Sequence, residues 1–394
     1  MSVVDILYVG GFEMPDKNAA AHRVLSNGKI FRELGYNVIF IDVDKNLSFN
    51  TDILSTFKNV QGFDCWSVPY PKTYTDWINY LSNIASIKVI ARKYSNIKFV
   101  IAYNYPALAL RNLKLFCKKN DVRIIADCTE WYSTKGTNVV FRIIKGLDSF
   151  LRMRVIQKQL DGLIVISKYL EQYYADCKNV VRIPPLVDIS EQKWRFDLSE
   201  QYENKAKLDK IRLIYSGNPG KNKDKLSNIV DSLYTLNRFD NYLMEIVGIS
   251  KDDFLVSYPD YKEKIEILGS KISFVGKVSH EESLKKLKNA DYSIFIRDKT
   301  RVTMAGFPTK FVESITCSTS VITSDVSDLR DYLSDDLKMH LIENDSVANI
   351  TKVLESIFSS DKSDAMQRGK QNNDSFHFMK YQESMRKLLS DKRG

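Results

Sequence analysis

The chain has 394 residues, more than one hydrophobic core usually supports, so we expect two domains of ordinary size. Hydrophobic residues make up 44% and charged residues 27% of the sequence, a balance that excludes a largely disordered chain. The formal net charge of +9 indicates an anionic partner: nucleic acid, an anionic membrane surface or a phosphorylated substrate. Because no zinc-finger spacing, RNP-type motif or basic low-complexity tail accompanies this charge, we do not expect nucleic acid.

Residues 1–10 enter an apolar strand pattern without a basic leader or a cleavage site. No apolar run approaches the roughly 20 residues that span a bilayer, so we expect a cytoplasmic protein. The five cysteines and four histidines are dispersed, which predicts neither a disulfide framework nor a zinc site. No metal is predicted, although magnesium held by carboxylates stays undecided.

In chain order, short apolar strands alternate with helix-length segments, a pattern typical of parallel sheets covered by helices. The strands expected in the first half are Ile6–Val9, Val38–Val43, Phe99–Tyr103, Ile124–Asp127, Leu163–Ile166 and Val180–Ile183. Those in the second half are Arg212–Tyr215, Leu243–Val247, Ile272–Val275, Tyr292–Ile296 and Ser320–Thr323. A helix is expected over Ala20–Leu34, with Gly35 ending it.

The two halves are separated after Pro184-Pro185 by the polar, aperiodic stretch Ser190–Lys210. We therefore predict an N-terminal domain over residues 1–188, a linker over 189–210 and a C-terminal domain over 211–374. The fold class is α/β, with two Rossmann-like, doubly wound parallel-sheet domains. The natural place for a ligand is a cleft between them, at the carboxyl ends of the strands.

A first candidate site is Gly10-Gly11, directly after the first strand, where glycines let the backbone approach a ligand. The turn leads to a helix that contains His22 and Arg23. A tight strand-to-helix turn explains these glycines as well as ligand contact does.

A second candidate is the loop after the first strand of the C-terminal domain, Tyr215-Ser-Gly-Asn-Pro-Gly-Lys-Asn-Lys-Asp-Lys225. Its glycines free the backbone and its lysines suit a diphosphate. The predicted contacts are Ser216, Gly217, Asn218, Lys221, Lys223 and Lys225. The Walker spacing is absent, which disfavours nucleoside triphosphate hydrolysis. The alternative is a solvated lysine turn.

The third candidate is Arg297 with the segment that follows it, which is the most informative part of the sequence. Gly306-Phe307-Pro308-Thr309-Lys310 predicts a loop entering a helix near Pro308, whose free amides suit a phosphate. Glu313 lies about one turn further on, where a carboxylate can accept both hydroxyls of a ribose. Arg297 and Lys310 can neutralise a departing diphosphate. The alternative is an ordinary capped helix with Glu313 on a solvated face.

These motifs resemble the retaining GT-B glycosyltransferases of glycosyltransferase family four, across most of the chain. The residues that carry the resemblance are Gly10-Gly11 with Ala21-His-Arg-Val-Leu25, Asp161–Ser167, Ser216-Gly217 with the downstream lysines, and Ala305–Glu313 followed by Val321-Ile322. The resemblance implies transfer of a hexose from a UDP- or GDP-linked sugar, with retention and without metal or other cofactor. It implies that Glu313 holds the donor ribose and that Arg297 forms a basic pair with one of Lys221, Lys223 or Lys225, of which Lys223 matches the motif best. The first of the family's two glutamates is replaced by Ala305, which leaves the sugar undetermined.

The resemblance also implies an acidic residue or histidine near the reacting sugar in the first domain. Asp127 and Glu130 end a central strand, where an acid can position an acceptor hydroxyl, and Trp131 or Tyr132 can stack on sugar. We expect these residues and His22 on the acceptor side, although Asp127 suits a turn cap equally well. The helix over residues 375–394 is expected to return to the first domain, as in GT-B enzymes.

Residues 139–160 predict a basic amphipathic helix, because this segment contains five basic residues and a single acidic one, Asp148. Such a helix can rest on the inner face of a cell membrane and present a lipid-linked acceptor for capsule or other surface polysaccharide. An ordinary helix covering the first sheet explains the pattern as well. Two other functions stay open: a nucleotide-sugar epimerase of the same fold, and a non-catalytic nucleotide-binding scaffold.

Overall fold

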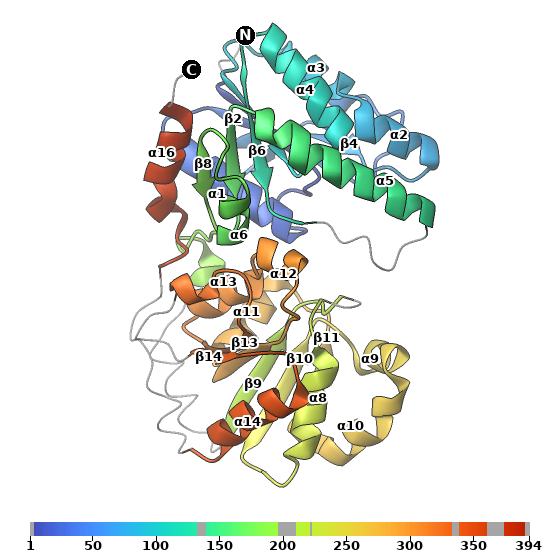
Figure 1. The fold of residues 1–394 in the computed structure, drawn as a ribbon, viewed down its shortest axis with the longest axis vertical. Helices are drawn as coiled ribbons and strands as arrows, with labels where there is room; N and C mark the ends of the chain where they lie inside the picture. Colours follow the sequence, from blue (N-terminus) through green and yellow to red (C-terminus); the bar gives the residue numbers. More distant parts are fainter. Residues whose placement is uncertain are drawn as a thin grey trace. The chain divides into compact units, whose positions relative to one another are not determined.

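A computed structural model of the chain describes residues 4–131, 139–195, 210–220, 223–332, 339–360 and 374–390, with only the backbone of residues 139–141. Tyr132 and Lys221 therefore lie outside the described residues. The chain divides into two compact units (Figure 1). The first comprises residues 1–187, 305–307 and 377–394, and the second residues 188–304 and 308–376. Residues 305–307 belong to the first unit, although they lie within the C-terminal domain predicted over residues 211–374.

The first unit contains an eight-stranded sheet in the order β3-β4-β2-β1-β5-β6-β7-β8, parallel except for β3. Its strands are β1 Ile6–Gly10, β2 Val38–Asp44, β3 Lys58–Val60, β4 Phe63–Pro69, β5 Phe99–Tyr103, β6 Arg123–Cys128, β7 Gly162–Val165 and β8 Val180–Arg182. Its helices are α1 Ala19–Glu33, α2 Tyr74–Ser82, α3 Ala85–Ala91, α4 Ala107–Lys119, α5 Val139–Phe150, α6 Lys168–Tyr173 and α16 Gln382–Ser390. Strands β3 and β4 are absent from the sequence-based prediction.

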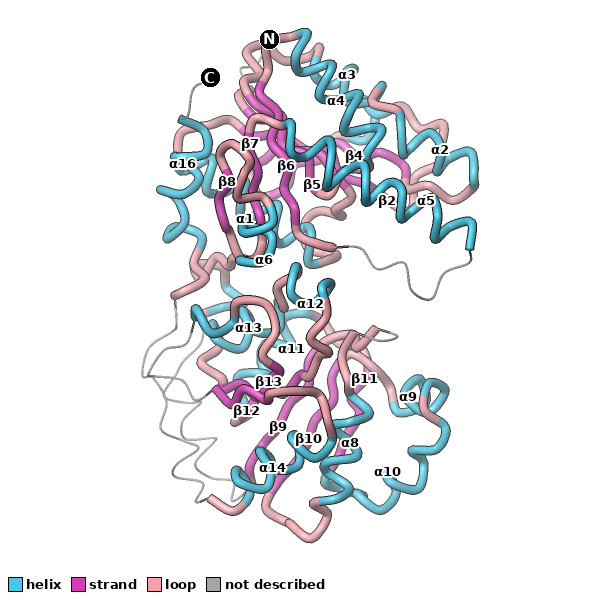
Figure 2. The backbone as a smooth tube through the Cα atoms, viewed as in Figure 1, coloured by secondary structure: helices cyan, strands magenta, loops and turns pink. Residues whose placement is uncertain are grey.

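Helices cover both faces of this sheet, as the alternation of apolar strands with helices predicts (Figure 2). Helices α1 and α16 pack on one face of the sheet. The core on this face contains Ile6, Tyr8 and Ile125 from the strands and Met385 and Leu388 from α16. Helices α2 to α5 lie on the other face (Figure 1). The C-terminal helix is thus part of the first unit, and Arg123 of β6 donates hydrogen bonds to its Leu388 and Leu389 carbonyls.

The second unit contains a six-stranded parallel sheet in the order β11-β10-β9-β12-β13-β14. Its strands are β9 Ile211–Ser216, β10 Tyr242–Val247, β11 Ile272–Gly276, β12 Tyr292–Phe295, β13 Ser320–Ser324 and β14 Met339–Ile342. Its helices are α8 Leu226–Thr235, α9 Lys251–Ser257, α10 Lys262–Leu268, α11 His280–Asn289, α12 Arg301–Ala305, α13 Thr309–Thr316 and α14 Val347–Phe358. Among the strands described in this unit, β14 is absent from the sequence-based prediction.

In both sheets the chain first adds strands on one side of its first strand and then on the other side. The point of reversal indicates where a ligand binds. In the second unit the chain runs from β9 outward to β11 and then returns to β12 on the other side of β9. In the first unit the corresponding pair is β1 and β5. Ligands of open α/β sheets bind outside the carboxyl ends of strands at such switch points. None of the helices in the described parts of the chain combines the length and apolar character needed to cross a membrane.

Candidate functional site

The glycine loop after β9 approaches other backbone closely. Gly217 has a φ of +113°, and a Cβ placed on it would lie 2.9 Å from Cε of Lys310. Its amide donates to the carbonyl of Val247 at 2.9 Å. Asn218 shapes the loop as well, because its Oδ1 accepts from the Gly220 amide at 2.8 Å. The positive φ therefore favours glycine at 217, and the flexible end of the Lys310 side chain lies against it.

A buried cluster of charged groups lies beside this loop. The carboxylate of Asp224 accepts from Nε of Arg297 at 2.6 Å and from Nζ of Lys310 at 2.5 Å. The hydroxyl of Tyr215 donates to the same carboxylate at 2.7 Å. The side chain of Asp224 is 1% exposed, and those of Arg297 and Lys310 are 7% and 11% exposed. Two cations on one carboxylate leave the cluster with excess positive charge.

Burial and the neighbouring charges set the protonation of the cluster. Burial lowers the pKa of Lys310 to about 8, against the opposing effect of Asp224. Burial would raise the pKa of Asp224, but Lys310 and Arg297 outweigh it and hold this pKa below its ordinary value. The pKa of the buried Tyr215 hydroxyl is raised, so Tyr215 stays neutral. At neutral pH the cluster therefore pairs one carboxylate with two cations.

The cluster lies at the switch point of the second sheet. Tyr215 belongs to the end of β9, Asp224 precedes α8, and Arg297 follows β12, which pairs with β9. Lys310 lies in the first turn of α13, where helix amides point outward. Cations, loop backbone and helix N-terminus thus meet where parallel α/β sheets bind ligands, and all three suit phosphate oxygens.

Glu313 lies one turn along α13 from Lys310. Its Oε1 is 3.2 Å from Nε2 of His280, the first residue of α11, and its side chain is 24% exposed. His280 is not among the residues predicted from sequence, since a single histidine at a helix start carries no motif. The hydroxyl of Ser216, at the end of β9, lies 2.6 Å from the hydroxyl of Ser283 on α11.

The remaining donor-side residues are distributed more widely. Lys223 is exposed at the loop, whereas Lys225 pairs with Asp298 at 2.9 Å and lies 3.8 Å from Asp345. Pro308 and Thr309 open α13 in the second unit. Gly306 and Phe307 belong to the first unit together with Ala305, whose carbonyl accepts from the Ser167 hydroxyl at 2.8 Å. The structure thus brings Lys310, Arg297 and Gly217 together and turns Lys225 toward other partners.

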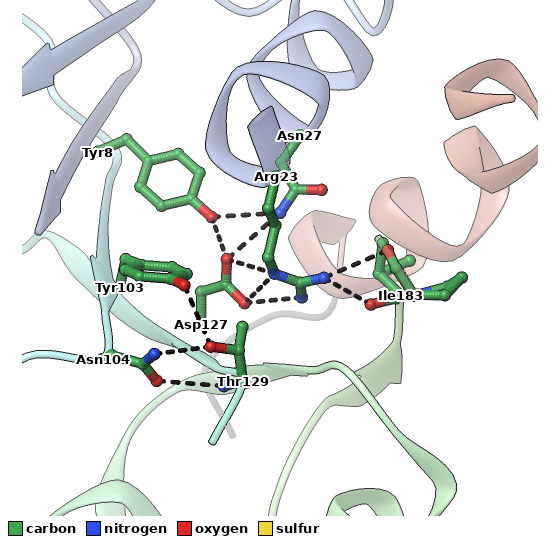
Figure 3. A network of polar contacts seen from close by, with 9 residues as sticks. Tyr8, Arg23, Asn27, Tyr103, Asn104, Asp127, Thr129 and Ile183 are labelled. Carbon is green, nitrogen blue, oxygen red and sulfur yellow. Dashed lines mark hydrogen bonds and ion pairs between the residues drawn. The ribbon is translucent and has the colours of Figure 1, made fainter. Parts of the chain in front are cut away.

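In the first unit, Asp127 is enclosed in a buried polar network. The side chain is 0% exposed, and its carboxylate accepts from Nη2 of Arg23 at 2.7 Å and from the Tyr8 hydroxyl at 2.5 Å (Figure 3). Asn27 donates to it as well, at 3.3 Å. Asp127 therefore neither caps a turn nor faces solvent, because a helix-borne arginine occupies both of its oxygens.

Arg23 connects this network to the end of the unit. Its Nη1 donates to the carbonyls of Ile183 and Pro184, which follow β8, at 2.8 and 3.2 Å (Figure 3). Burial would lower the pKa of Arg23, but Asp127 raises it above its ordinary value. The pKa of Tyr8 is raised well above its ordinary value by burial and by Asp127. Sequence gave no signal for this pairing, because an arginine inside an apolar helix pattern has many potential partners.

The other predicted residues of the first unit have different surroundings. Glu130 is exposed, His22 is half-buried, and the Trp131 ring packs edge-on against Tyr169 and Tyr173. Gly10 is required by strand packing, since a Cβ there would lie 2.7 Å from Cβ of Tyr103, while Gly11 is exposed. Of the two acidic residues predicted on the acceptor side, Asp127 is buried and Glu130 is exposed to solvent.

A cavity of about 1220 Å³ in the first unit lies apart from these residues. It is lined by Lys88 and Arg92 at the end of α3, by Lys119 at the end of α4, and by the starts of β5 and β6. Cations at helix ends complement the helix dipole, which accounts for its charge. Among the described residues, no three His, Cys, Asp or Glu side chains are arranged to hold a metal ion.

Comparison with known proteins gives a family match over part of the chain and similar solved structures. Residues 198–374 match the family model described as "Glycosyl transferases group 1". No curated protein sequence matches the chain. Among solved structures, sucrose-phosphate synthase from Thermosynechococcus elongatus is similar, with a TM-score of 0.72, 15% identity and 98% of each chain covered.

Two further structures share the fold. Trehalose-6-phosphate synthase from Burkholderia multivorans has a TM-score of 0.67 at 8% identity, covering 99% of this chain and 98% of that one. HepE from Anabaena, in complex with UDP and glucose, has a TM-score of 0.64 at 10% identity, covering 98% and 99%. The fold is therefore the two-sheet GT-B architecture, and the match over residues 198–374 supports a glycosyltransferase.

Proposed function

We propose that this protein is a retaining glycosyltransferase that moves a sugar from a nucleoside diphosphate sugar, UDP- or GDP-linked, to a glycan or lipid-linked acceptor. The observation that carries the proposal is the cluster of Arg297 and Lys310 on Asp224, beside the glycine loop at the switch point of the second sheet. HepE, which shares the fold, was solved with UDP-glucose. A role in capsule or other surface polysaccharide synthesis is part of the proposal.

The chemistry proposed for the site is charge stabilisation at the leaving group. In this proposal the loop backbone and the amides of α13 bind the diphosphate, while Arg297, Lys310 and Lys223 take up the charge that develops on it. Glu313 holds the ribose, and no metal is required. Glu130 and Trp131, at the carboxyl edge of the first sheet, position the acceptor, with Asp127 supporting them from the buried network.

Replacing Glu313 with alanine should weaken nucleotide-sugar binding by about 10- to 100-fold, because hydrogen bonds to a charged carboxylate contribute roughly 1.5–3 kcal/mol. The measurement is the melting temperature against UDP-glucose, GDP-mannose and ADP-glucose, since a ligand that binds the folded state raises it. Glu281→Ala, an exposed glutamate on α11 of the same unit, is the matched control and should keep the full shift.

Product analysis separates the proposal from its alternatives. Transfer to an acceptor with unchanged anomeric configuration supports the retaining enzyme. A changed nucleotide sugar without acceptor indicates the epimerase, and binding without turnover indicates the scaffold. If none of the three nucleotide sugars raises the melting temperature of the unmodified protein, the proposed donor site is wrong.

We also propose that the first unit docks on an anionic membrane surface through α5. Four apolar side chains of this helix are strongly exposed: Ile143 at 64%, Ile144 at 49%, Leu147 at 57% and Phe150 at 50%. Exposed apolar surface of this kind is typical of interaction sites. Exposed Arg142 and Arg154 flank it, which suits anionic headgroups.

The acid in this segment is turned elsewhere. Asp148 accepts from the Ala107 amide at the start of α4 at 2.7 Å, so its carboxylate serves a helix end instead of facing the exposed apolar residues. Leu108, next to that amide, is 51% exposed. The charge complementarity therefore favours anionic lipid over a neutral partner.

The double change Ile143→Ser, Leu147→Ser should reduce sedimentation with phosphatidylglycerol-containing vesicles at low salt by more than tenfold. Two large side chains contribute about 1.5–3 kcal/mol each when they enter an apolar phase. Val256→Ser, which alters a residue 82% exposed on α9 of the second unit, is the control and should sediment normally. Failure of the unmodified protein to sediment, or its dimerisation through α5 in solution, would contradict the membrane proposal.

A further inference from the structure

Asp224 touches both buried cations of the candidate site, yet it is a poor phosphate ligand. Its Oδ1 accepts from Arg297, and its Oδ2 accepts from Lys310 and Tyr215. A carboxylate repels an anionic ligand, so its burial beside a diphosphate site is not explained by ligand contact. Burying a carboxylate also has a desolvation cost, which the two cations offset.

We infer that Asp224 is a positioning residue, which fixes the Arg297 guanidinium and the Lys310 amine at the switch point of the second sheet for the donor diphosphate. This inference rests on the proposed function. It concerns how the cations are prepared and assigns Asp224 no contact with substrate.

The path of the Lys310 side chain supports this role. A Cβ placed on Gly217 would lie 2.9 Å from Cε of Lys310, so the lysine side chain passes directly against the glycine loop. Its Nζ lies 3.7 Å from the centre of the Tyr215 ring and 2.5 Å from the Tyr215 hydroxyl. Ring, loop and carboxylate therefore leave the ammonium few positions other than the one that Asp224 fixes.

The charged and titratable groups around Lys310 set the sign of the pH effect. Burial and Arg297 lower the pKa of Lys310, while Asp224 and Glu313 raise it, and the balance is a pKa of about 8. Tyr215 stays neutral because its pKa is raised. Lys310 is therefore charged below about pH 8 and neutral above it. Without the Asp224 charge its pKa falls further, so the charge is lost at a lower pH.

The test is the affinity of Asp224→Asn for a nucleotide sugar between pH 6 and pH 9. UDP-glucose, GDP-mannose and ADP-glucose are suitable probes, because a diphosphate diester keeps constant charge over this range. Binding to the unmodified protein should decline as the pH rises through about 8. In the variant the decline should begin at least about one pH unit lower, which is on the order of tenfold weaker binding at pH 8.

Two further variants distinguish positioning from a general loss of stability. Asp224→Glu restores the charge and should move the decline back toward pH 8. Asp231→Asn removes a carboxylate of α8 that pairs with Lys264 of α10 and accepts a hydrogen bond from Tyr261, outside the site in the same unit, and should leave the pH profile unchanged. An unmodified protein that binds none of the probes refutes the proposed function; a normal profile in folded Asp224→Asn refutes only the role of Asp224.

Discussion

Replacing Asp127 with asparagine should lower the free energy of unfolding of the first unit by about 3–5 kcal/mol, the usual cost of leaving one partner of a buried ion pair uncompensated. Asparagine has nearly the same shape as aspartate, so the change removes charge while leaving little cavity. Arg23 is 3% exposed and cannot reach water to recover its hydration. The Tyr8 hydroxyl loses a charged acceptor at the same time.

The loss should be localised and non-additive. Hydrogen exchange should show reduced protection in β1, β6 and α1, the elements that carry Tyr8, Asp127 and Arg23. The double change Arg23→Met, Asp127→Asn should be less destabilising than the sum of the single changes. Each single change leaves the charge of the other partner buried and unpaired, whereas the double change removes both charges. Removing Arg386, which pairs with exposed Glu383 on α16, should change the free energy of unfolding by about 1 kcal/mol or less.

A small effect of Asp127→Asn, with normal folding but slower transfer of sugar, would instead indicate that Asp127 acts on the acceptor. The two outcomes are separable because stability and turnover are measured independently. The network also ties the end of the first unit to its sheet, since Arg23 holds the Ile183 and Pro184 carbonyls. Loss of Asp127 is therefore expected to loosen that segment as well.

The strands that sequence predicts are those whose apolar character is local. Strands β1 and β5 are buried at every residue, so periodicity identifies them directly. Strand β4, with the sequence FDCWSVP, carries Asp64 and Ser67 and ends in proline, and it becomes a strand through its pairing with β2. Its propensity is overridden by tertiary context, which a single sequence does not contain.

The same division applies to the candidate site. The glycine loop is predictable, because turn residues directly after a strand mark the edge where ligands bind. The segment from Gly306 to Lys310 is marked by the glycine and proline that precede the start of α13. The ion pairs are not, because Arg23 and Asp127 are 104 residues apart and Asp224 and Lys310 are 86 apart. From the sequence, Asp127 at the end of a strand resembles a catalytic acid. Its burial against Arg23 is known only from the structure.

Replacing Gly248 with alanine should destabilise the second unit by roughly 3–5 kcal/mol, since a strained backbone and overpacking each contribute about 1–3 kcal/mol. Gly248 has a φ of +107°, and a Cβ on it would lie 2.6 Å from the carbonyl carbon and oxygen of Gly217. Backbone cannot rotate away as a side chain does, so the glycine loop must move. The same change should therefore weaken nucleotide-sugar binding.

Gly269→Ala is the matched control, because Gly269 also has a positive φ, +52°, but nothing lies within 4 Å of its Cβ position. It should cost only the conformational strain, about 1–3 kcal/mol, and leave nucleotide-sugar binding intact. Urea unfolding of the two variants measures the difference, which isolates the contact between Gly248 and Gly217 from the cost of the backbone conformation. Equal destabilisation would mean that the loop after β9 yields easily, and the close approach of strand ends at the candidate site would then be no constraint on the donor loop.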